Sequence, residues 1–288
     1  MKIGIGLPAS IPGVSGEFIL EWAREADAGP FSSLSIIDRI VYANYEPLIA
    51  LAGVAGVTRR VRLMTTVLVT PLRSPGLLAK QAASLDALSG GRLTLGLGVG
   101  GREDEFEATE KSARNRGQYF ERQLETMARL WSGEPFSATA GPVGPPPVQV
   151  GGPEVLIGAY TEAAIKRVGH WNNGYIAGSQ DLPQVPRFFR LAEQAWRDAG
   201  RPGRPRLVGC SYYGLGPNAT EGIAATIGDY YSYLGAGAQQ FASRIASTPE
   251  ALKSLIKTFE DVGADELTLW PCIAELEQMQ RLEDVISG

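Results

Sequence analysis

The feature that most constrains this fold is a regular alternation of strand-like and helix-like segments along all 288 residues. Short apolar runs typical of strands lie at residues 2–8, 34–38, 61–68, 93–99, 155–158, 174–177, 207–215 and 266–271. Segments with helical spacing follow them at residues 16–28, 47–57, 75–88, 113–131, 161–170, 183–199, 249–262 and 274–286. Eight such units predict one domain over residues 1–288, a TIM (β/α)₈ barrel, with a doubly wound open sheet as the alternative.

One proline- and glycine-rich segment, residues 132–153, interrupts this alternation after the fourth long helix. Proline lacks a backbone donor and fixes its own φ, so the segment suits neither a central strand nor a helix. We interpret it as an excursion over the barrel and expect it to form a lid over the pocket, together with residues 235–248.

The composition is that of an ordinary globular protein and excludes several classes of partner. Charged residues make up 20% of the chain and the net charge is −4, which gives no electrostatic support for binding nucleic acid or a membrane surface. No apolar run approaches the roughly 18 residues of a membrane helix, and the first residues lack a secretion signal, so we expect a cytoplasmic protein. Cys210 and Cys272 have neither metal-ligand nor redox spacing and are expected to be buried thiols.

The stretch from residue 92 to residue 108, RLTLGLGVGGREDEFEA, passes from a glycine-laced strand into an acidic helix start. Glycines at every second position predict that one face of the strand meets backbone, a ligand or another element at close range. The acids and free N–H groups after Gly100 and Gly101 suit a helix N-terminus. We therefore expect a site at the carboxyl end of this strand.

In a barrel, the carboxyl ends of the strands carry the chemistry. The residues expected there include few acids and no histidine, which argues against a metal hydrolase, a Ser-His-Asp enzyme or any other metal site. The single histidine, His170, falls at a helix end and is interpreted as solvated. A glycine-rich, aromatic pocket suits a planar cofactor that supplies the chemistry itself.

Several of these segments, taken in order, resemble the bacterial luciferase-like superfamily of flavin and deazaflavin oxidoreductases. The stretch at 92–108 is similar to the family pattern R-L-x-L-G-x-G-x-G-x-x-E-x-E-F, and the similarity continues in MTTVLVTP (64–71), in the helix from residue 75 to 88 and in VQVGGPEVLIG (148–158). The resemblance covers residues 1–180 well and the rest mainly by element order and length.

The resemblance implies a TIM barrel that binds coenzyme F420, or alternatively FMN. In such enzymes the ring leans on a bulge at the end of the third strand, formed here by Thr65, Thr66 and Val67. That bulge contains a non-prolyl cis peptide bond, which by position joins Thr66 and Val67. The alternative is an ordinary trans strand end.

The resemblance also assigns the cofactor phosphate to the end of the fifth strand. Gly158, Ala159 and Tyr160 open a helix there, and their N–H groups would hold the phosphate while Thr161 supplies a hydroxyl. Relatives often carry Gly-Gly followed by Ser or Thr at this place, so this chain departs from the pattern. The alternative is a simple turn between strand and helix.

Asp38 and Arg39 stand at the end of the second strand, where many deazaflavin relatives have Asp-His. Arginine is permanently charged and cannot shuttle a proton. Two interpretations of these candidate catalytic residues are open: Arg39 stabilises negative charge on the reduced ring or the substrate, or it pairs structurally with Asp38.

The remaining candidates are residues that could contact the substrate or the cofactor, and each also has a structural interpretation. Tyr42, Tyr212 and Trp270 suit contact with a small-molecule substrate, and core packing is the alternative for each. Together with Gly98, Gly100 and Gly101, Arg102 is placed in the cofactor site, where it contacts the cofactor tail. The acids after Arg102 are interpreted as a helix cap.

The leading hypothesis is an oxidoreductase that transfers a hydride between F420 and a small organic substrate. The short chain and the GGREDEFEA stretch look more like the deazaflavin branch of the family than the luciferase branch. The alternatives are an FMN-dependent monooxygenase supplied by a partner flavin reductase, and a non-catalytic flavin-binding protein that has lost its acid. The resemblance implies a homodimer paired through the helices beside the second and third strands.

Overall fold

The strands close into one parallel barrel. The computed structural model describes residues 1–171 and 173–288, apart from the side chains of residues 180 and 181. Each strand pairs with its neighbours in the chain, and the first closes the ring against the eighth. The strands are β1 (Lys2–Gly6), β2 (Ser33–Ile36), β3 (Arg62–Val69), β4 (Leu93–Gly98), β5 (Glu154–Gly158), β6 (Gly174–Ala177), β7 (Arg206–Tyr213) and β8 (Glu266–Pro271). The predicted TIM barrel is confirmed, and the open-sheet alternative is wrong.

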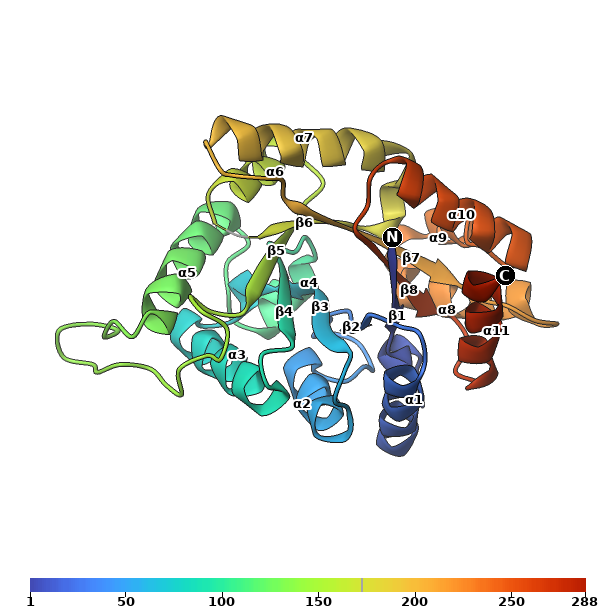
Figure 1. The fold of residues 1–288 in the computed structure, drawn as a ribbon, viewed down its shortest axis with the longest axis horizontal. Coiled ribbons are helices and arrows are strands. Elements are labelled where there is room, and N and C mark those ends of the chain that lie inside the picture. The colour runs from blue at the N-terminus through green and yellow to red at the C-terminus, as the bar shows by residue number, and fades with distance from the viewer. Residues whose placement is uncertain (172) are drawn as a thin grey trace.

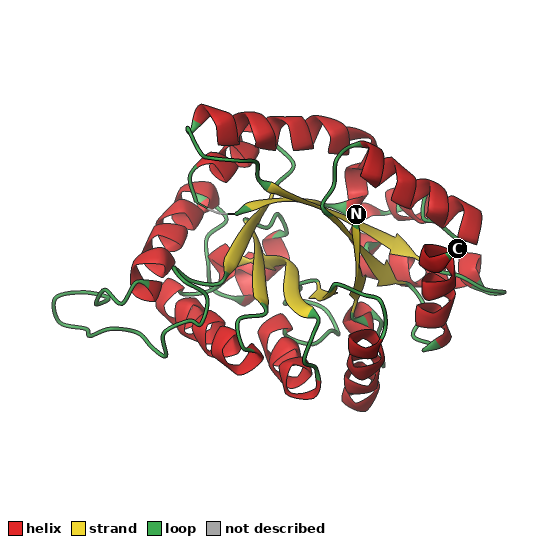
Figure 2. Cartoon of the chain, viewed as in Figure 1, coloured by secondary structure: helices red, strands yellow, loops and turns green. Residues whose placement is uncertain are grey.

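Helices surround the strands as an outer ring (Figures 1 and 2). They are α1 (Gly16–Ala28), α2 (Pro47–Val57), α3 (Pro75–Ser89), α4 (Glu103–Ala108), α5 (Arg116–Trp131), α6 (Glu162–Ile165), α7 (Val185–Asp198), α8 (Ala219–Tyr230), α9 (Ala236–Ala242), α10 (Pro249–Asp261) and α11 (Glu277–Ser287). Short 3₁₀ turns lie at Pro8–Ser10, Thr70–Leu72, Lys166–Gly169, Ser179–Gln184 and Ser232–Leu234. Within the described chain, none of these helices is both long and apolar enough to cross a bilayer.

Local sequence signals explain where several helices begin and end. Ser15 and Thr248 accept a hydrogen bond from the third helical N–H of α1 and α10, at 3.1 and 3.2 Å, as N-cap residues do. Proline occupies the first turn of α2, α3 and α10, where its missing N–H costs nothing. Helix α3 ends at Gly90, whose φ of 66° is left-handed.

Two predicted helices are interrupted. The helix predicted from residue 113 begins at Arg116, and the acidic run before it forms the separate helix α4. Between them Glu110 and Asn115 both have φ of 55°, a conformation that a right-handed helix cannot contain. The helix predicted at 161–170 is one turn, α6, followed by a 3₁₀ turn.

Apolar side chains form two layers. The larger lies between the strands and the outer helices and includes Trp22, Leu51 and Phe120, all nearly inaccessible. The second fills the barrel interior and includes Met64 and Cys210. Both cysteines are buried free thiols, as predicted.

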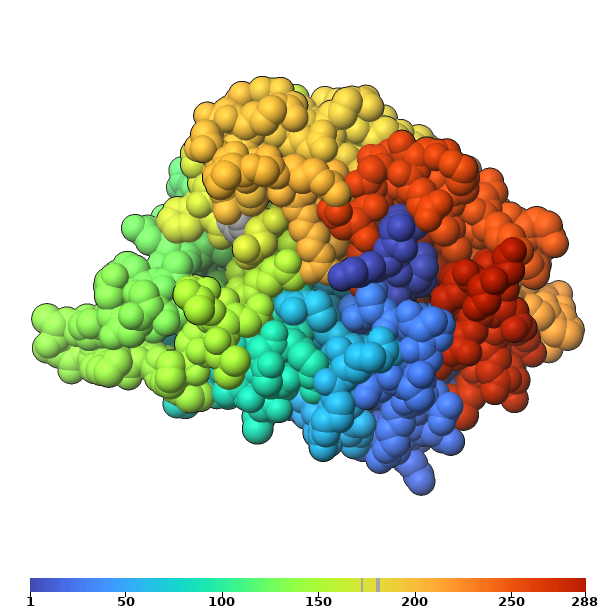
Figure 3. Space-filling view, viewed as in Figure 1, coloured from blue at the N-terminus to red at the C-terminus, as the bar shows by residue number. Residues whose placement is uncertain are grey.

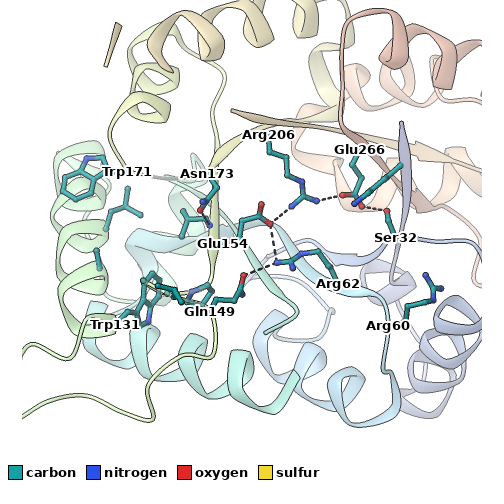
Figure 4. A pocket seen from close by; sticks show the side chains of 18 of the residues that line it. Ser32, Arg60, Arg62, Trp131, Gln149, Glu154, Trp171, Asn173, Arg206 and Glu266 are labelled. Carbon is teal, nitrogen blue, oxygen red and sulfur yellow. Dashed lines mark hydrogen bonds and ion pairs between the residues drawn. The ribbon is translucent and has the colours of Figure 1, made fainter. Parts of the chain in front are cut away.

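A charged layer closes the amino-terminal end of the barrel (Figure 4). Arg206 forms ion pairs with Glu154 on one side and Glu266 on the other. Arg62 lies 3.4 Å from Glu154, and Ser33 donates a hydrogen bond of 2.6 Å to Glu266. Since the Glu266 side chain is only 1% exposed, its charge depends on these partners.

We expect Arg206→Ala to destabilise the fold by about 3 kcal/mol, because it leaves two carboxylates without their shared cation. Urea unfolding followed by circular dichroism measures this change. The matched control is Arg204→Ala, since the Arg204 side chain is 54% exposed in its pair with Asp265 and should contribute less than about 1 kcal/mol. Equal effects of the two substitutions would contradict the stabilising role of the layer.

The proline-rich segment does not lie over the pocket, so this part of the lid prediction is wrong. Residues 132–153 connect α5 to the start of β5 and project from the side of the molecule (Figures 1 and 3). The N–H groups of Val148 and Gln149 donate to Asp86 in α3 at 2.8 and 3.0 Å. A loop that follows a helix must return to the beginning of the next strand, which is the end of the barrel opposite the expected site.

Candidate active site at the barrel mouth

The third strand carries an irregularity at the predicted place. Its pairing with β4 shifts register between Thr65 and Leu68. The peptide bond between Thr66 and Val67 is cis, as the resemblance predicts, and the trans alternative is wrong. The hydroxyls of Thr65 and Thr66 donate to the carbonyls of Gly96 and Ile36 at 2.8 and 3.2 Å. Hydrogen bonds to the neighbouring strands therefore hold this bulge on both sides.

The glycines of β4 and β5 make room for the bulge. A Cβ atom on Gly98 would lie 2.7 Å from Val67 Cγ2, and one on Gly158 would lie 2.6 Å from Val67 Cγ1. A Cβ on Gly96 would overlap the Thr65 carbonyl oxygen. The glycine face of the strand therefore meets the β3 backbone, the half-buried Val67 side chain and, at Gly96, the Ile176 side chain of β6.

Gly100 and Gly101 differ in their surroundings. Gly100 has φ of 67° and a Cβ there would overlap Val69, so both conformation and space favour glycine. A Cβ on Gly101 would have no atom within 4 Å among the residues that the structure describes. Of the two glycines, Gly101 therefore has room for a side chain and Gly100 does not.

We predict that Gly98→Ala destabilises the protein by about 1–3 kcal/mol, because the new methyl group would overpack against Val67. The double variant Gly98→Ala/Val67→Ala should recover part of this loss, since it removes the methyl groups in the way. Chemical unfolding of the set gives the coupling energy. Gly101→Ala is the control and should change little, and additive effects of the Gly98 and Val67 substitutions would refute the packing account.

The predicted phosphate site follows β5 in the expected order. The Ala159 carbonyl accepts a hydrogen bond of 2.6 Å from Tyr175. The Tyr160 ring is 51% exposed, and its hydroxyl occupies the space that a Cβ on Gly178 would fill. Thr161 is the N-cap of α6, and its hydroxyl oxygen accepts from the Ala164 N–H at 3.3 Å. Because the Thr161 hydroxyl oxygen is the acceptor in this cap, its O–H can still donate a hydrogen bond to a ligand oxygen.

Asp38 and Arg39 do not pair with each other, so that interpretation is wrong. The Asp38 carboxylate accepts two hydrogen bonds from Arg73, at 2.7 and 3.2 Å, and one from the Val69 N–H at 2.8 Å. Arg73 also pairs with Glu46 at 3.0 Å. Because Val69 lies just beyond the cis bond, Asp38 anchors the end of the bulge, with its side chain 1% exposed.

Arg39 pairs with the carboxylate of Glu105, which lies in α4, the helix that follows β4. Its Nε donates to Glu105 at 3.0 Å, while its Nη atoms donate to the carbonyls of Tyr230 and Val41. The guanidinium also lies 4.9 and 5.1 Å from the ring centroids of Tyr42 and Tyr230. Burial raises the pKa of Glu105, although its hydrogen bond from Ile40 and the charge of Arg39 oppose that rise.

An aromatic cluster covers the barrel interior at this end. Tyr212 lies 4.9 Å from Trp270 and 6.0 Å from Phe241, measured between ring centroids. The hydroxyls of Tyr212 and Tyr231 are 3.1 Å apart. Trp270 Nε1 donates to Ser35 at 3.0 Å, which fixes the indole inside the barrel. Two of the three predicted substrate residues therefore also pack as core side chains.

Part of the cluster belongs to the connection between β7 and β8. Residues 219–242, which we name the mouth cover, comprise α8, the 3₁₀ turn Ser232–Leu234 and α9. Tyr230, Tyr231 and Phe241 of the cover are buried in the same cluster as the barrel interior. Of the second part of the lid prediction, residues 235–248, only residues 235–242 belong to this cover, and α8 was not part of the prediction.

Arg102 lies at the edge of the mouth, where its Nε is 3.9 Å from Glu105 Oε1, an ion-pair contact beyond hydrogen-bond distance. Its Nη2 bonds to Asp104 at 3.2 Å, and its guanidinium lies 4.1 Å from the centroid of the Tyr233 ring. Nε and Nη1 are buried without a hydrogen-bond partner among the described residues. Buried donors of this kind fit an anionic oxygen brought by a ligand.

Sequence reasoning missed the partners of the predicted residues. Glu105 appeared only as one of three acids at a helix start, and Arg73 did not appear at all. The run DYYSYL at residues 229–234 was a usable signal, because three tyrosines beside a glycine-rich turn suit an aromatic cover over a pocket.

A cavity of about 1080 Å³ lies at the opposite, amino-terminal end of the barrel. Trp131, Trp171 and Asn173 line it beside the charged layer of Glu154 and Arg206 (Figure 4). None of the predicted site residues lines this cavity. The mouth and this cavity are therefore separate sites at opposite barrel ends.

Comparison with known proteins identifies the family of this chain and solved structures that share its fold. Residues 1–266 match the family model described as luciferase-like monooxygenase. The oxygenase component of a flavin-dependent trigonelline monooxygenase from Acinetobacter baylyi is 24% identical over 268 residues, which cover 78% of this chain and 74% of the relative.

Two solved structures share the whole fold. A monooxygenase from Streptomyces bottropensis superposes with a TM-score of 0.81 at 24% identity, over 100% of this chain and 98% of the other. An F420-dependent secondary alcohol dehydrogenase gives a TM-score of 0.83 at 16% identity, over 99% and 98%. With the family match spanning nearly the entire barrel, this chain belongs to the luciferase-like monooxygenase family.

Proposed function

We propose that this protein is an F420-dependent oxidoreductase that transfers a hydride between the deazaflavin ring and a small organic substrate at the barrel mouth. The observation that carries the proposal is the bulge at Thr66 and Val67, held at the mouth by the glycines of β4 and β5. The short chain and the GREDEFEA stretch favour F420 over FMN.

The residues around the mouth fit such a cofactor. Thr66 and Val67 would support the ring, and Gly158 with Thr161 would hold a phosphate at the end of β5. Arg102 offers its buried Nη1 donor to an anionic oxygen of the cofactor tail, while its Nε faces Glu105. When bound, the cofactor supplies the hydride chemistry, while the protein binds and orients it and excludes water.

Arg39 takes an electrostatic role in this proposal. Its charge lies among Glu105, Tyr42 and Tyr230 rather than beside Asp38. Since arginine keeps its proton, it contributes a fixed positive charge near the mouth. Asp38 positions the bulge by accepting a hydrogen bond from the Val69 N–H.

The test is to titrate the purified protein with F420 and with FMN, each in both redox states, and to follow ring absorbance. We expect micromolar binding of F420, about −8 kcal/mol, and millimolar binding of FMN, about −4 kcal/mol. Micromolar FMN binding with oxygen consumption would favour a monooxygenase supplied by a partner reductase. Failure to bind either ring overturns the proposal, and a bound ring that is never reduced or reoxidised points to a non-catalytic binding protein.

Two variants locate the binding in this titration. Arg102→Met removes the two buried donors and should weaken F420 binding by about tenfold or more. The control is Arg129→Met. Arg129 lies at the carboxyl end of α5 with its side chain 47% exposed, so this substitution should leave F420 binding unchanged.

We also propose a homodimer that pairs through α2 and α3. Helix α2 reads PLIALAGVAGV and has no charged or polar side chain, so neither of its faces suits water. Ile49 at its start and Leu77 and Leu88 on α3 are 69%, 57% and 71% exposed. Exposed apolar side chains on adjacent helices are typical of an interface.

Ile49→Glu should therefore convert the dimer into a monomer, because it places a charge in the apolar contact. Light scattering coupled to size-exclusion chromatography measures the mass. Val150→Glu is the control, since Val150 is fully exposed on the segment between α5 and β5. A monomeric wild-type protein, or a dimer unaffected by Ile49→Glu, would contradict this assembly.

A further inference from the structure

Two arginines at the barrel mouth share one carboxylate. Arg39 follows β2 and Arg102 follows β4, and both approach Glu105 Oε1, at 3.0 and 3.9 Å. The Glu105 side chain is 3% exposed and the Arg39 side chain 7%. In such surroundings a charge without a partner is costly, so the position of Arg39 depends on Glu105. Arg102 is 21% exposed and is shared between Glu105 and Asp104, to which its Nη2 donates at 3.2 Å.

Each arginine also contacts the mouth cover. Arg39 Nη1 donates to the carbonyl of Tyr230 at 3.0 Å, and its guanidinium lies against the Tyr230 ring. Tyr230 is the last residue of α8, where helix carbonyls carry partial negative charge that favours a cation. Arg102 stacks on Tyr233, three residues further along the cover.

A third contact joins the cover to the loop after β2. The Tyr42 hydroxyl hydrogen-bonds to Asp229, and the Tyr42 ring packs edge-on against Tyr230 with centroids 5.0 Å apart. The contacts of Arg39, Tyr42 and Arg102 all fall on residues 229–233, where α8 ends and the 3₁₀ turn begins. These three contacts hold the middle of the cover to the barrel rim. Apolar packing of α8 and α9 and a hydrogen bond of 2.7 Å from Thr226 to the Cys272 carbonyl attach the rest of the cover.

The chain after this stretch contains two glycines, Gly235 and Gly237, at which the backbone can turn. Gly235 has φ of 55° and ψ of −127°, a conformation available essentially only to glycine. Gly237 and two alanines follow, and Leu234 before it is 38% exposed. Release of the contacts at residues 229–233 would therefore let the following part of the cover, residues 231–242, open about Gly235.

We propose that Glu105 is a positioning residue that keeps the mouth cover closed, by holding Arg39 and Arg102 against Tyr230 and Tyr233. Loss of its charge frees both arginines and raises the fraction of time for which the cover is open. Entry to the mouth is then controlled from the first turn of α4. This inference rests on the proposed function only in taking the mouth as the site.

Hydrogen–deuterium exchange of the protein without cofactor, resolved by mass spectrometry, tests the proposal. Glu105→Gln keeps the shape of the side chain and removes its charge. We expect amides of residues 231–242 to exchange about tenfold faster, the loss of about 1.4 kcal/mol of closing free energy, while the barrel strands keep their wild-type rates. Glu103→Gln, an exposed acid in the same helical turn, is the matched control and should change neither region.

Unchanged exchange in the cover, or an equal increase in the cover and the strands, would overturn the proposal. Should Glu105→Gln fail to fold, Arg102→Met and Tyr233→Leu break the same tether from its exposed side and must accelerate the cover alone. In the double variant Glu105→Gln/Arg102→Met the effects must be less than additive, because both act on one contact. Since no cofactor is present, a failure here is distinct from a failure of F420 to bind.

Discussion

The contact between the β3 bulge and the glycines of the next two strands is the constraint on which the mouth of this barrel depends. Val67 fills the space that side chains at Gly98 and Gly158 would need. The hydroxyls of Thr65 and Thr66 bond to the strands on either side, and Asp38 holds the amide of Val69. A peptide surface fixed in this way leaves little freedom for a ring that rests on it.

Asp38 and Arg39, two consecutive residues after β2, hold different parts of the site in place. Asp38 turns inward to Arg73 and the bulge, whereas Arg39 turns to Glu105 and the mouth cover. The floor of the site and its cover are therefore positioned from the same strand end. This arrangement explains how an arginine at this position is tightly packed, with Arg39 only 8% exposed.

The alternation of strand-like and helix-like segments predicts the barrel, because it is a local signal. The place of the bulge comes from the resemblance to the family and not from the pattern of residues. The sequence does not predict the partner of Arg39, since Glu105 is 66 residues away and meets it only when β2 and β4 join the same ring. The lid prediction failed at residues 132–153 for another reason. Composition shows that the segment is irregular, whereas chain direction decides that it lies at the amino-terminal end. The aromatic packing of Tyr212 and Trp270 likewise depends on Tyr231 and Phe241, which arrive from the cover.

A crystal structure of the protein with its bound cofactor tests the central claim most directly. The account predicts that the tricyclic ring lies in van der Waals contact with the peptide between Thr66 and Val67, beneath the mouth cover. A ring in the cavity beside Glu154 and Arg206 at the opposite end, or one at the mouth that does not touch this peptide, would contradict it.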